Sequence, residues 1–197
     1  IAEFRHRYPA VDIVLELTDK SLDLTAHAID IAIHFGEPPD RRILARSIAP
    51  NRRFLCAAPS YLQGRAALVT PRDLHAHECI VIRENHTAFN NWQLSDGSSQ
   101  EMVKVRGGLS TNFGEIAVDW ALAGHGIVLR SEWDVAPYLR SGQLQRVLAP
   151  WEGTRSDIYA IYPQRHHLSS KVRVFLDFLA EKFTSQRALE AAKEQVW

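Results

Sequence analysis

The sequence has little of several features that define large classes of protein. Its 197 residues include only two cysteines, and 23 basic side chains balance 23 acidic ones. No apolar run approaches the roughly 20 residues that a membrane-spanning helix needs. The balanced charge leaves no basic surface of the kind that binds nucleic acid. We therefore expect no membrane segment here, and no contact with DNA through this segment.

The two cysteines, Cys56 and Cys79, both lie in apolar, strand-like runs. A free cysteine in such a run behaves as a small buried hydrophobe, and we favour this interpretation. The alternative is a redox pair, which requires Cα atoms within about 7 Å of each other. So few cysteines are typical of a reducing compartment, here the cytoplasm.

Motifs for catalysis, cofactors and metals are also absent. The sequence has no Gly-x-Ser-x-Gly elbow, no P-loop and no dinucleotide-binding glycine pattern. The histidine pairs His75 with His77 and His166 with His167 lack the spacing and the partners of a metal site. We therefore expect no catalytic residue, no cofactor and no metal.

What the chain does have is an apolar content of 46%, enough for a substantial core. It opens with Ile1, Phe4 and Tyr8 at helical spacing, and Pro9 closes this helix. Neither a methionine nor a capping residue precedes Ile1. We expect the chain to be cut from a longer protein, with a further strand before its first residue.

The first part of the chain has an α/β pattern. Apolar and acidic residues alternate over Val11–Thr18, which predicts a strand. A short helix is expected over Asp19–Ala28 and another strand over Asp30–Phe35, before a break at Gly36-Glu37-Pro38-Pro39. A strand, a helix and a strand of these lengths predict a parallel pair with a right-handed crossover.

The middle and last parts contain further strands and helices. Phe54–Ala58 and Cys79–Ile82 are expected strands, and Trp92–Leu94 with Met102–Val105 predict a hairpin around an Asp-Gly turn. A helix is expected over Trp133–Leu139.

The chain then returns to the style of its first part. A strand is expected over Ile158–Tyr162, and a long helix capped by Ser169 or Ser170 follows it. We expect the polar tail, residues 184–197, to be loose or packed on a partner.

The most informative stretch is STNFGEIAVDWALAGHGIVLRS, residues 110–131. Asn112 is a good N-cap, and Glu115 follows at capping-box spacing. Gly124 ends the helix, and a buried strand begins at Ile127. The expected apolar helix face consists of Ile116, Ala117, Trp120 and Ala121. We expect the backbone N–H groups of Phe113 and Gly114 at the start of this helix to be free, and such groups favour an anion.

This order of segments predicts two lobes joined by two crossing segments, near Ala45–Arg53 and Ala149–Asp157. Lobe I comprises residues 1–50 with 155–183, and lobe II comprises residues 51–154, leaving the tail outside both. A cleft between two lobes is a favoured place for a small ligand.

Several runs, taken together and in this order, resemble the effector-binding domain of LysR-type transcriptional regulators. They are FRHRYPAVDIVLELTD (4–19), DIAIHFG (30–36), LARSIAPNRRFLCAAPSYL (44–62), PRDLHAHECI (71–80), the run from Ser110 to Pro150, and IYAIYPQRHHLSSKVRVFLDFL (158–179). The resemblance covers nearly the whole chain apart from the tail.

The resemblance implies an α/β fold of two Rossmann-like lobes, like a type II periplasmic binding protein, whose first strand is missing here. It implies that a winged helix-turn-helix domain, absent from this chain, binds promoter DNA in a homodimer or homotetramer. It also implies that a small-molecule effector binds between the lobes, and the chain looks closest to the branch with organic acid effectors. The main alternative is a solute-binding protein of a transport system, and an enzyme would need catalytic groups that the sequence lacks.

The same resemblance implies the candidate ligand-binding residues. Thr18 and Asp19 lie at the end of the first expected strand, at the carboxyl edge where open α/β sheets bind ligands, although Asp19 is equally suited to cap the next helix. Thr111, Asn112, Phe113 and Gly114 would face them from the other lobe, although Asn112 is equally suited to cap its own helix. His34 replaces an arginine that is usual in the family, and a structural role is the alternative for it as well.

Overall fold

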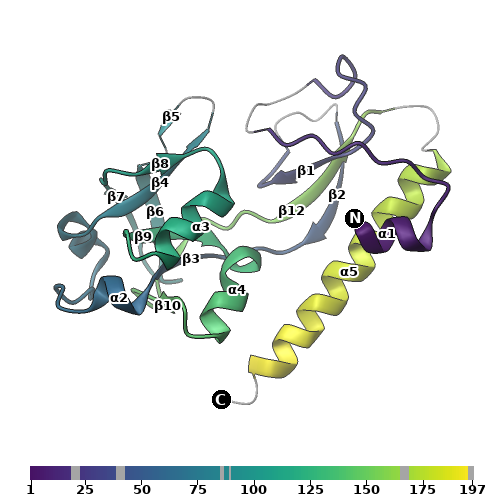
Figure 1. Ribbon diagram of the computed structural model, residues 1–197. Coiled ribbons are helices and arrows are strands. Elements are labelled where there is room, and N and C mark those ends of the chain that lie inside the picture. The colour runs from purple at the N-terminus through teal and green to yellow at the C-terminus, as the bar shows by residue number, and fades with distance from the viewer. Residues whose placement is uncertain (19–22, 39–42, 85–86, 89, 165–168, 195–197) are drawn as a thin grey trace. The chain divides into compact units, whose positions relative to one another are not determined.

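The computed structural model describes residues 1–18, 23–38, 43–84, 87–88, 90–164 and 169–194. The chain divides into two compact units (Figure 1). Unit 1 comprises Ile1–Pro50 and Asp157–Trp197, and unit 2 comprises Asn51–Ser156. No helix within the described ranges is both long and apolar enough to cross a membrane.

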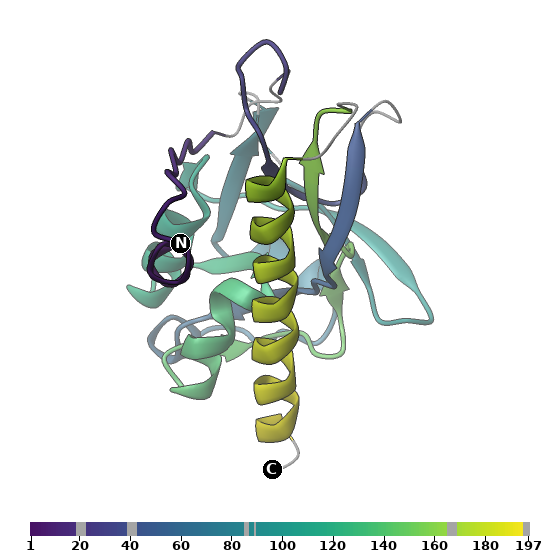
Figure 2. The same ribbon diagram turned by 90° about the vertical axis from the view of Figure 1, so that its right-hand side faces the viewer.

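Unit 1 is built on a three-stranded antiparallel sheet in the order β1-β12-β2. Its strands are β1 (Ala32–Phe35), β2 (Leu44–Ala49) and β12 (Ile158–Tyr162). The long helix α5 (Ser170–Glu194) runs along this sheet (Figure 2). Val172 and Leu176 of α5 are buried, as are Ile158 and Ala160 of β12. The core of unit 1 therefore lies between one helix and one face of the sheet.

The predicted first helix is present as α1 (Ala2–Arg7). Phe4 is fully buried, and its ring lies 4.9 Å from that of Phe175 and 5.2 Å from that of Phe178, both on α5. An ion pair of 3.0 Å between Arg7 and Glu181 adds to this contact. Aromatic packing therefore holds the start of the chain on the long helix.

The parallel strand-helix-strand arrangement predicted for the first part of the chain is wrong. Residues 11–18 are irregular, and Val14 and Leu17 are 88% and 71% exposed. Residues 24–28 form a turn, in which Asp23 accepts the N–H groups of Thr25 and Ala26. β1 pairs with β12, and the pairing is antiparallel. An alternating pattern defines two faces, but a strand also needs a hydrogen-bonded neighbour, and no described strand pairs with residues 11–18.

Of the two alternatives for the tail, a loose segment is wrong for residues 184–194, because α5 continues to Glu194, and packing on a partner stays a prediction. Its last part reads TSQRALEAAKE and consists mostly of residues with high helix propensity. Propensity therefore carries the helix beyond Phe183, the last apolar residue of the periodic pattern.

Unit 2 contains a larger mixed sheet in the order β5-β4-β9-β3-β11-β6-β7. Its strands are β3 (Arg53–Ala57), β4 (Cys79–Glu84), β5 (Thr87–Ala88), β6 (Asn91–Ser95), β7 (Gln100–Lys104), β9 (Ile127–Ser131) and β11 (Glu152–Gly153), with β8 (Ser110–Thr111) beside β4 and β10 (Gln145–Arg146) beside β3. β4 runs parallel to β8 and β9, and the other pairs are antiparallel. The predicted hairpin is confirmed as β6 and β7.

Helices cover this sheet, and strand alternation divides the core into two clusters. The helical segments are α2 (Pro59–Leu62), the 3-10 helix η1 (Pro71–Ala76), α3 (Gly114–Leu122) and α4 (Glu132–Arg140). On β3, Leu55 packs in a cluster with Leu74 and Leu94, whereas Phe54 packs in a second cluster with Val135 of α4. Successive residues of a strand point to opposite faces, so the two clusters lie on opposite faces of the sheet.

Both cysteines are buried and free, as small core residues are expected to be. Cys56 belongs to the cluster that α3 and α4 cover, and Cys79 belongs to the other cluster. Burial raises the pKa of each thiol to about 12. Neither thiol is therefore a reactive thiolate near neutral pH.

Candidate functional site

The start of α3 differs from the predicted cap. Phe113 is the N-cap, in an extended conformation, and no side chain caps the helix. Instead, the Oγ1 atom of Thr111 accepts the N–H of Phe113 at 3.0 Å. The predicted capping by Asn112 and Glu115 is therefore wrong, because the threonine two residues before Phe113 turns the chain and the helix begins later.

The end of α3 agrees with the predicted glycine stop. Gly124 has a φ of +81°, and its N–H bonds to the carbonyl of Ala121 at 3.0 Å. The N–H of His125 bonds to the carbonyl of Trp120 at 3.0 Å, which completes a Schellman motif. β9 begins two residues later, at Ile127. Both ends of α3 are thus fixed by local hydrogen bonds.

The buried face of α3 is partly the predicted one. Ala117 and Ala121 are buried as expected, and Val118 joins them. Ile116 is 42% exposed, whereas Trp120 is partly buried against the core. The helix is therefore rotated slightly from the face that the sequence predicts.

Three backbone N–H groups at the start of α3 are available to a ligand. Those of Gly114, Glu115 and Ile116 have no acceptor within the described part of the chain. The N–H of Phe113 is occupied by Thr111, so the expectation of a free group there is wrong. Because a helix N-terminus carries about half a positive charge, the remaining N–H groups favour an anion.

Arg130 of β9 adds a full positive charge at the same place. A Cβ atom on Gly114 would overlap the guanidinium of Arg130, so the close approach of these two residues requires glycine. The Arg130 side chain is only 21% exposed and pairs with Asp134 of α4. Its Nε atom is buried and has no hydrogen-bond partner in the part of the chain that the structure describes.

Arg130 is not among the candidate ligand-binding residues predicted from the sequence. Two signals could have indicated it: a charged residue directly after the apolar strand run IVL, and a glycine in the first turn of a helix. Glycine lowers helix stability, so its presence in the first turn indicates a close approach by another group. Guanidinium and backbone N–H groups together are typical of carboxylate recognition.

The other candidate residues belong to unit 1. Thr18 ends the irregular segment, so it does not lie at the end of a strand as predicted. Asp19 lies outside the described residues. His34 is partly exposed on β1, opposite Tyr159 of β12. The structure therefore groups Thr111–Gly114 at one helix start in unit 2, and keeps Thr18 and His34 within unit 1.

A cavity of about 340 Å³ lies elsewhere in unit 2. It is lined by Glu78, Cys79, Ile80, Gly108, Leu109, Trp120 and His125. Trp120 lies in the last turn of α3 and His125 follows the end of that helix, whereas Gly114 is its first residue. The Glu78 carboxylate already accepts the N–H of Gly108 at 3.1 Å. The cavity includes none of the predicted ligand-binding residues.

The chain is similar in sequence to a known family and to known proteins. The family described as LysR substrate binding domain matches residues 1–184. The HTH-type transcriptional activator TtdR of Escherichia coli strain K12 is 40% identical over 180 residues, which cover 91% of this chain and 58% of that protein. The HTH-type transcriptional regulator DmlR of the same strain is 37% identical over 176 residues, covering 89% of this chain and 57% of that protein. The chain thus spans less than two thirds of these relatives.

Solved structures agree as well. The regulatory domain of CrgA from Neisseria meningitidis has a TM-score of 0.81 at 28% identity, covering 92% of this chain and 89% of that one. Full-length AphB of Vibrio cholerae has a TM-score of 0.78 at 25% identity, covering 92% of this chain and 62% of that one.

These likenesses define a ligand-binding domain with an α/β fold of the type II periplasmic-binding-protein kind, as predicted. The chain belongs to the LysR substrate-binding-domain family and is similar to the corresponding part of HTH-type transcriptional regulators. Its relatives are described as transcriptional regulators, which does not favour the alternative of a transport protein.

Proposed function

We propose that this domain senses a small carboxylate, which the start of α3 and Arg130 bind. The observation that carries the proposal is the Arg130 guanidinium, held against Gly114 beside three backbone N–H groups without acceptors. A carboxylate oxygen could accept from these N–H groups and from the guanidinium together. Asp134 neutralises Arg130 in the absence of ligand, so an incoming carboxylate competes with it.

The remaining candidates are part of the same proposal. Effector domains that this chain resembles hold their ligand between two lobes, so Thr18, Asp19 and His34 are proposed to contribute from unit 1. Asn112, which does not cap α3, is exposed and keeps its side-chain amide for a ligand.

The proposed role is regulation, with no catalysis and no cofactor. A full-length regulator would bind promoter DNA through another domain, as a homodimer or homotetramer in the cytoplasm. The effector would act by binding one arrangement of the protein better than another, since a ligand with equal affinity for both shifts nothing.

Isothermal titration calorimetry with acetate, succinate, malate and benzoate tests the site. Arg130→Met should weaken the binding of the best acid by roughly tenfold or more, because a charge-assisted hydrogen bond contributes about 1.5–3 kcal/mol. Arg72→Met is the matched control, since Arg72 is an 81% exposed arginine of the same unit. Asn112→Ala combined with Thr18→Val tests the other candidates.

The result that overturns the proposal is equal binding by the wild type and the Arg130→Met variant. Binding that is weakened only in the Asn112→Ala, Thr18→Val double variant would move the carboxylate away from Arg130.

A further inference from the structure

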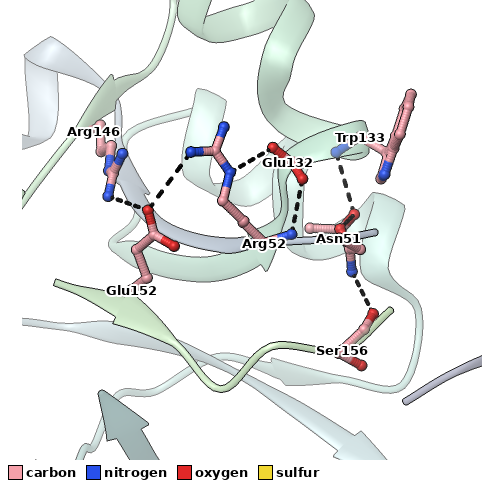
Figure 3. A network of polar contacts seen from close by, with 8 residues as sticks. Asn51, Arg52, Glu132, Trp133, Arg146, Glu152 and Ser156 are labelled. Carbon is pink, nitrogen blue, oxygen red and sulfur yellow. Dashed lines mark hydrogen bonds and ion pairs between the residues drawn. The ribbon is translucent and has the colours of Figure 1, made fainter. Parts of the chain in front are cut away.

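The chain crosses between the units twice, and the buried side chain of Asn51 joins the two crossings by a hydrogen bond (Figure 3). Asn51 is 1% exposed, and its Nδ2 atom donates to the carbonyl of Ser156 at 2.9 Å. The N–H of Ser156 in turn donates to the carbonyl of Asn51 at 3.3 Å. These two residues are the first and last of unit 2, so its two ends are bonded to each other.

The same asparagine is bonded to the start of α4. Ser131, which is 7% exposed, donates its hydroxyl to the Oδ1 atom of Asn51 at 2.6 Å. The Ser131 hydroxyl also caps α4 by accepting the N–H of Trp133 at 3.2 Å. We call Asn51, Ser131 and Ser156 the Asn51 clasp. A buried amide with its donor and acceptor both used is costly to disrupt.

A second link runs beside the clasp. Arg52 donates its backbone N–H and its Nε atom to the two carboxylate oxygens of Glu132, each at 2.9 Å. The N–H of Glu132 donates to the carbonyl of Arg52, also at 2.9 Å. The first crossing is therefore fastened to α4 by both backbone and side-chain hydrogen bonds.

On the other side of each crossing, the next residues are fastened within unit 1. Ala49 pairs with Ile158 in the sheet of that unit. The carbonyl of Asp157 accepts the N–H of Gly36 at 2.8 Å. Each crossing thus changes from one unit to the other over a single short link, Pro50–Asn51 or Ser156–Asp157.

The first turn of α4 also carries Asp134, the partner of Arg130. Arg130 precedes Ser131 in the chain, and Asp134 follows Glu132 by two residues. One short segment, residues 130–134, therefore contains the charge pair at the proposed carboxylate site and the groups that hold both crossings. The Arg130–Asp134 pair therefore spans the same segment as Ser131 and Glu132.

We propose that Asn51 is a positioning residue that holds the two crossings as one rigid pair and couples them to the carboxylate site through residues 130–134. The coupling to the carboxylate rests on the function proposed above, whereas the rigid pairing does not. Motion between the units is then confined to the two links, and effector binding biases that motion.

Hydrogen exchange of the unliganded full chain tests the rigid pairing. Asn51→Ala should speed exchange of the Ser156 and Trp133 amides by roughly tenfold, because a buried hydrogen bond to each partner's segment is lost. Exchange in β7 should not change. Asn91→Ala, at an exposed asparagine of β6, is the matched control. Unchanged exchange at Ser156 in Asn51→Ala overturns the rigid pairing.

A second variant covers the case in which Asn51→Ala does not fold. Asn51→Asp keeps the oxygen that accepts from Ser131 but replaces the donor to Ser156 by a second acceptor. Its expected signature is faster exchange at Ser156 with Trp133 unchanged. Equal acceleration at both amides would contradict separate links to the two partners.

Double-mutant analysis of exchange tests the coupling. Asp134→Asn should change the Ser156 exchange rate in the wild-type background by about threefold or more, and by less in the Asn51→Ala background. Equal effects in both backgrounds overturn the coupling.

Measurements of the distance between the two units distinguish a positioning role of Asn51 from a merely structural one. Dyes can be attached to Ala67→Cys in unit 2 and Ser185→Cys in unit 1, because both positions are exposed and burial keeps Cys56 and Cys79 unreactive. A bound acid should narrow the inter-dye distance distribution in the wild type and not in Asn51→Ala, with affinity preserved within about threefold. Absence of acid binding in the wild type contradicts the proposed function alone. Narrowing in both proteins overturns the coupling.

Discussion

Two arginine-centred constellations in unit 2 look alike but differ in what surrounds them. Arg130 lies against Gly114 at the start of α3 and has one acidic partner, Asp134. Arg146 pairs with Glu152 at 2.9 Å, and its guanidinium lies 4.2 Å from the centre of the Phe54 ring. Both arginines have a buried Nε atom without a hydrogen-bond partner in the described residues.

The difference shows that an unpartnered N–H does not by itself indicate a ligand site. The Arg146 guanidinium stacks on an aromatic face, and such a contact favours a cation. Arg52 lies over the same ring at 5.0 Å and contacts Glu132 and Glu152, so this network contains two charges of each sign (Figure 3). Arg130 instead lies beside the positive end of a helix, a place that favours a further negative charge.

The largest expected effect is on the free energy of unfolding, which should depend on the Arg146 constellation much more than on the Arg130 constellation. Phe54 is 7% exposed and supports both Arg52 and Arg146. Phe54→Ala should lower the free energy of unfolding by about 3–5 kcal/mol, measured by urea denaturation. Arg130→Met should lower it by less than about 1 kcal/mol, since partly exposed ion pairs contribute little. Similar losses in both variants would remove the distinction.

The next effect separates them by ligand affinity. Gly114→Ala adds a methyl group where the Arg130 guanidinium lies, so the arginine must move. Binding of the best carboxylate should weaken by roughly tenfold, because one charge-assisted hydrogen bond is lost. Gly108→Ala, whose added Cβ meets nothing within 4 Å, serves as the matched control. Unchanged affinity in Gly114→Ala would mean that Arg130 does not bind the ligand.

How far the sequence predicts the structure also differs between regions. In unit 2 the expected strand Cys79–Ile82, the hairpin and the glycine stop at Gly124 are all present, because turn residues and buried runs act locally. In unit 1 the pattern of residues 11–18 predicts a strand that the structure lacks, because strand pairing depends on residues that lie far away in the sequence. Similarly, the sequence indicates an anion-binding helix start but not Arg130, which approaches Gly114 from another strand.

The cap of α3 gives the same lesson at the scale of three residues. Asn112 and Glu115 have capping-box spacing, yet Phe113 is the N-cap and Thr111 makes the turn. Thr111 belongs to β8, which pairs with β4, so the sheet sets where the helix begins. Spacing within a motif gives the element, whereas its neighbours in space decide its first residue.

The smallest expected effect compares two carboxylates by the same chemical change. Asp134→Asn removes the charge that competes for Arg130, so a carboxylate ligand should bind about threefold to tenfold more tightly. Glu152→Gln removes a charge from the Phe54 network and should leave that affinity unchanged, while lowering the free energy of unfolding by about 1 kcal/mol or less. Calorimetry and urea denaturation of both variants measure these quantities. Since each substitution replaces one oxygen by an amide nitrogen, size is constant and only the partner of the charge differs. Weaker binding in Asp134→Asn would mean that Asp134 contacts the ligand and does not compete with it. Tighter binding in Glu152→Gln would mean that the gain in affinity does not depend on which arginine the lost charge paired with.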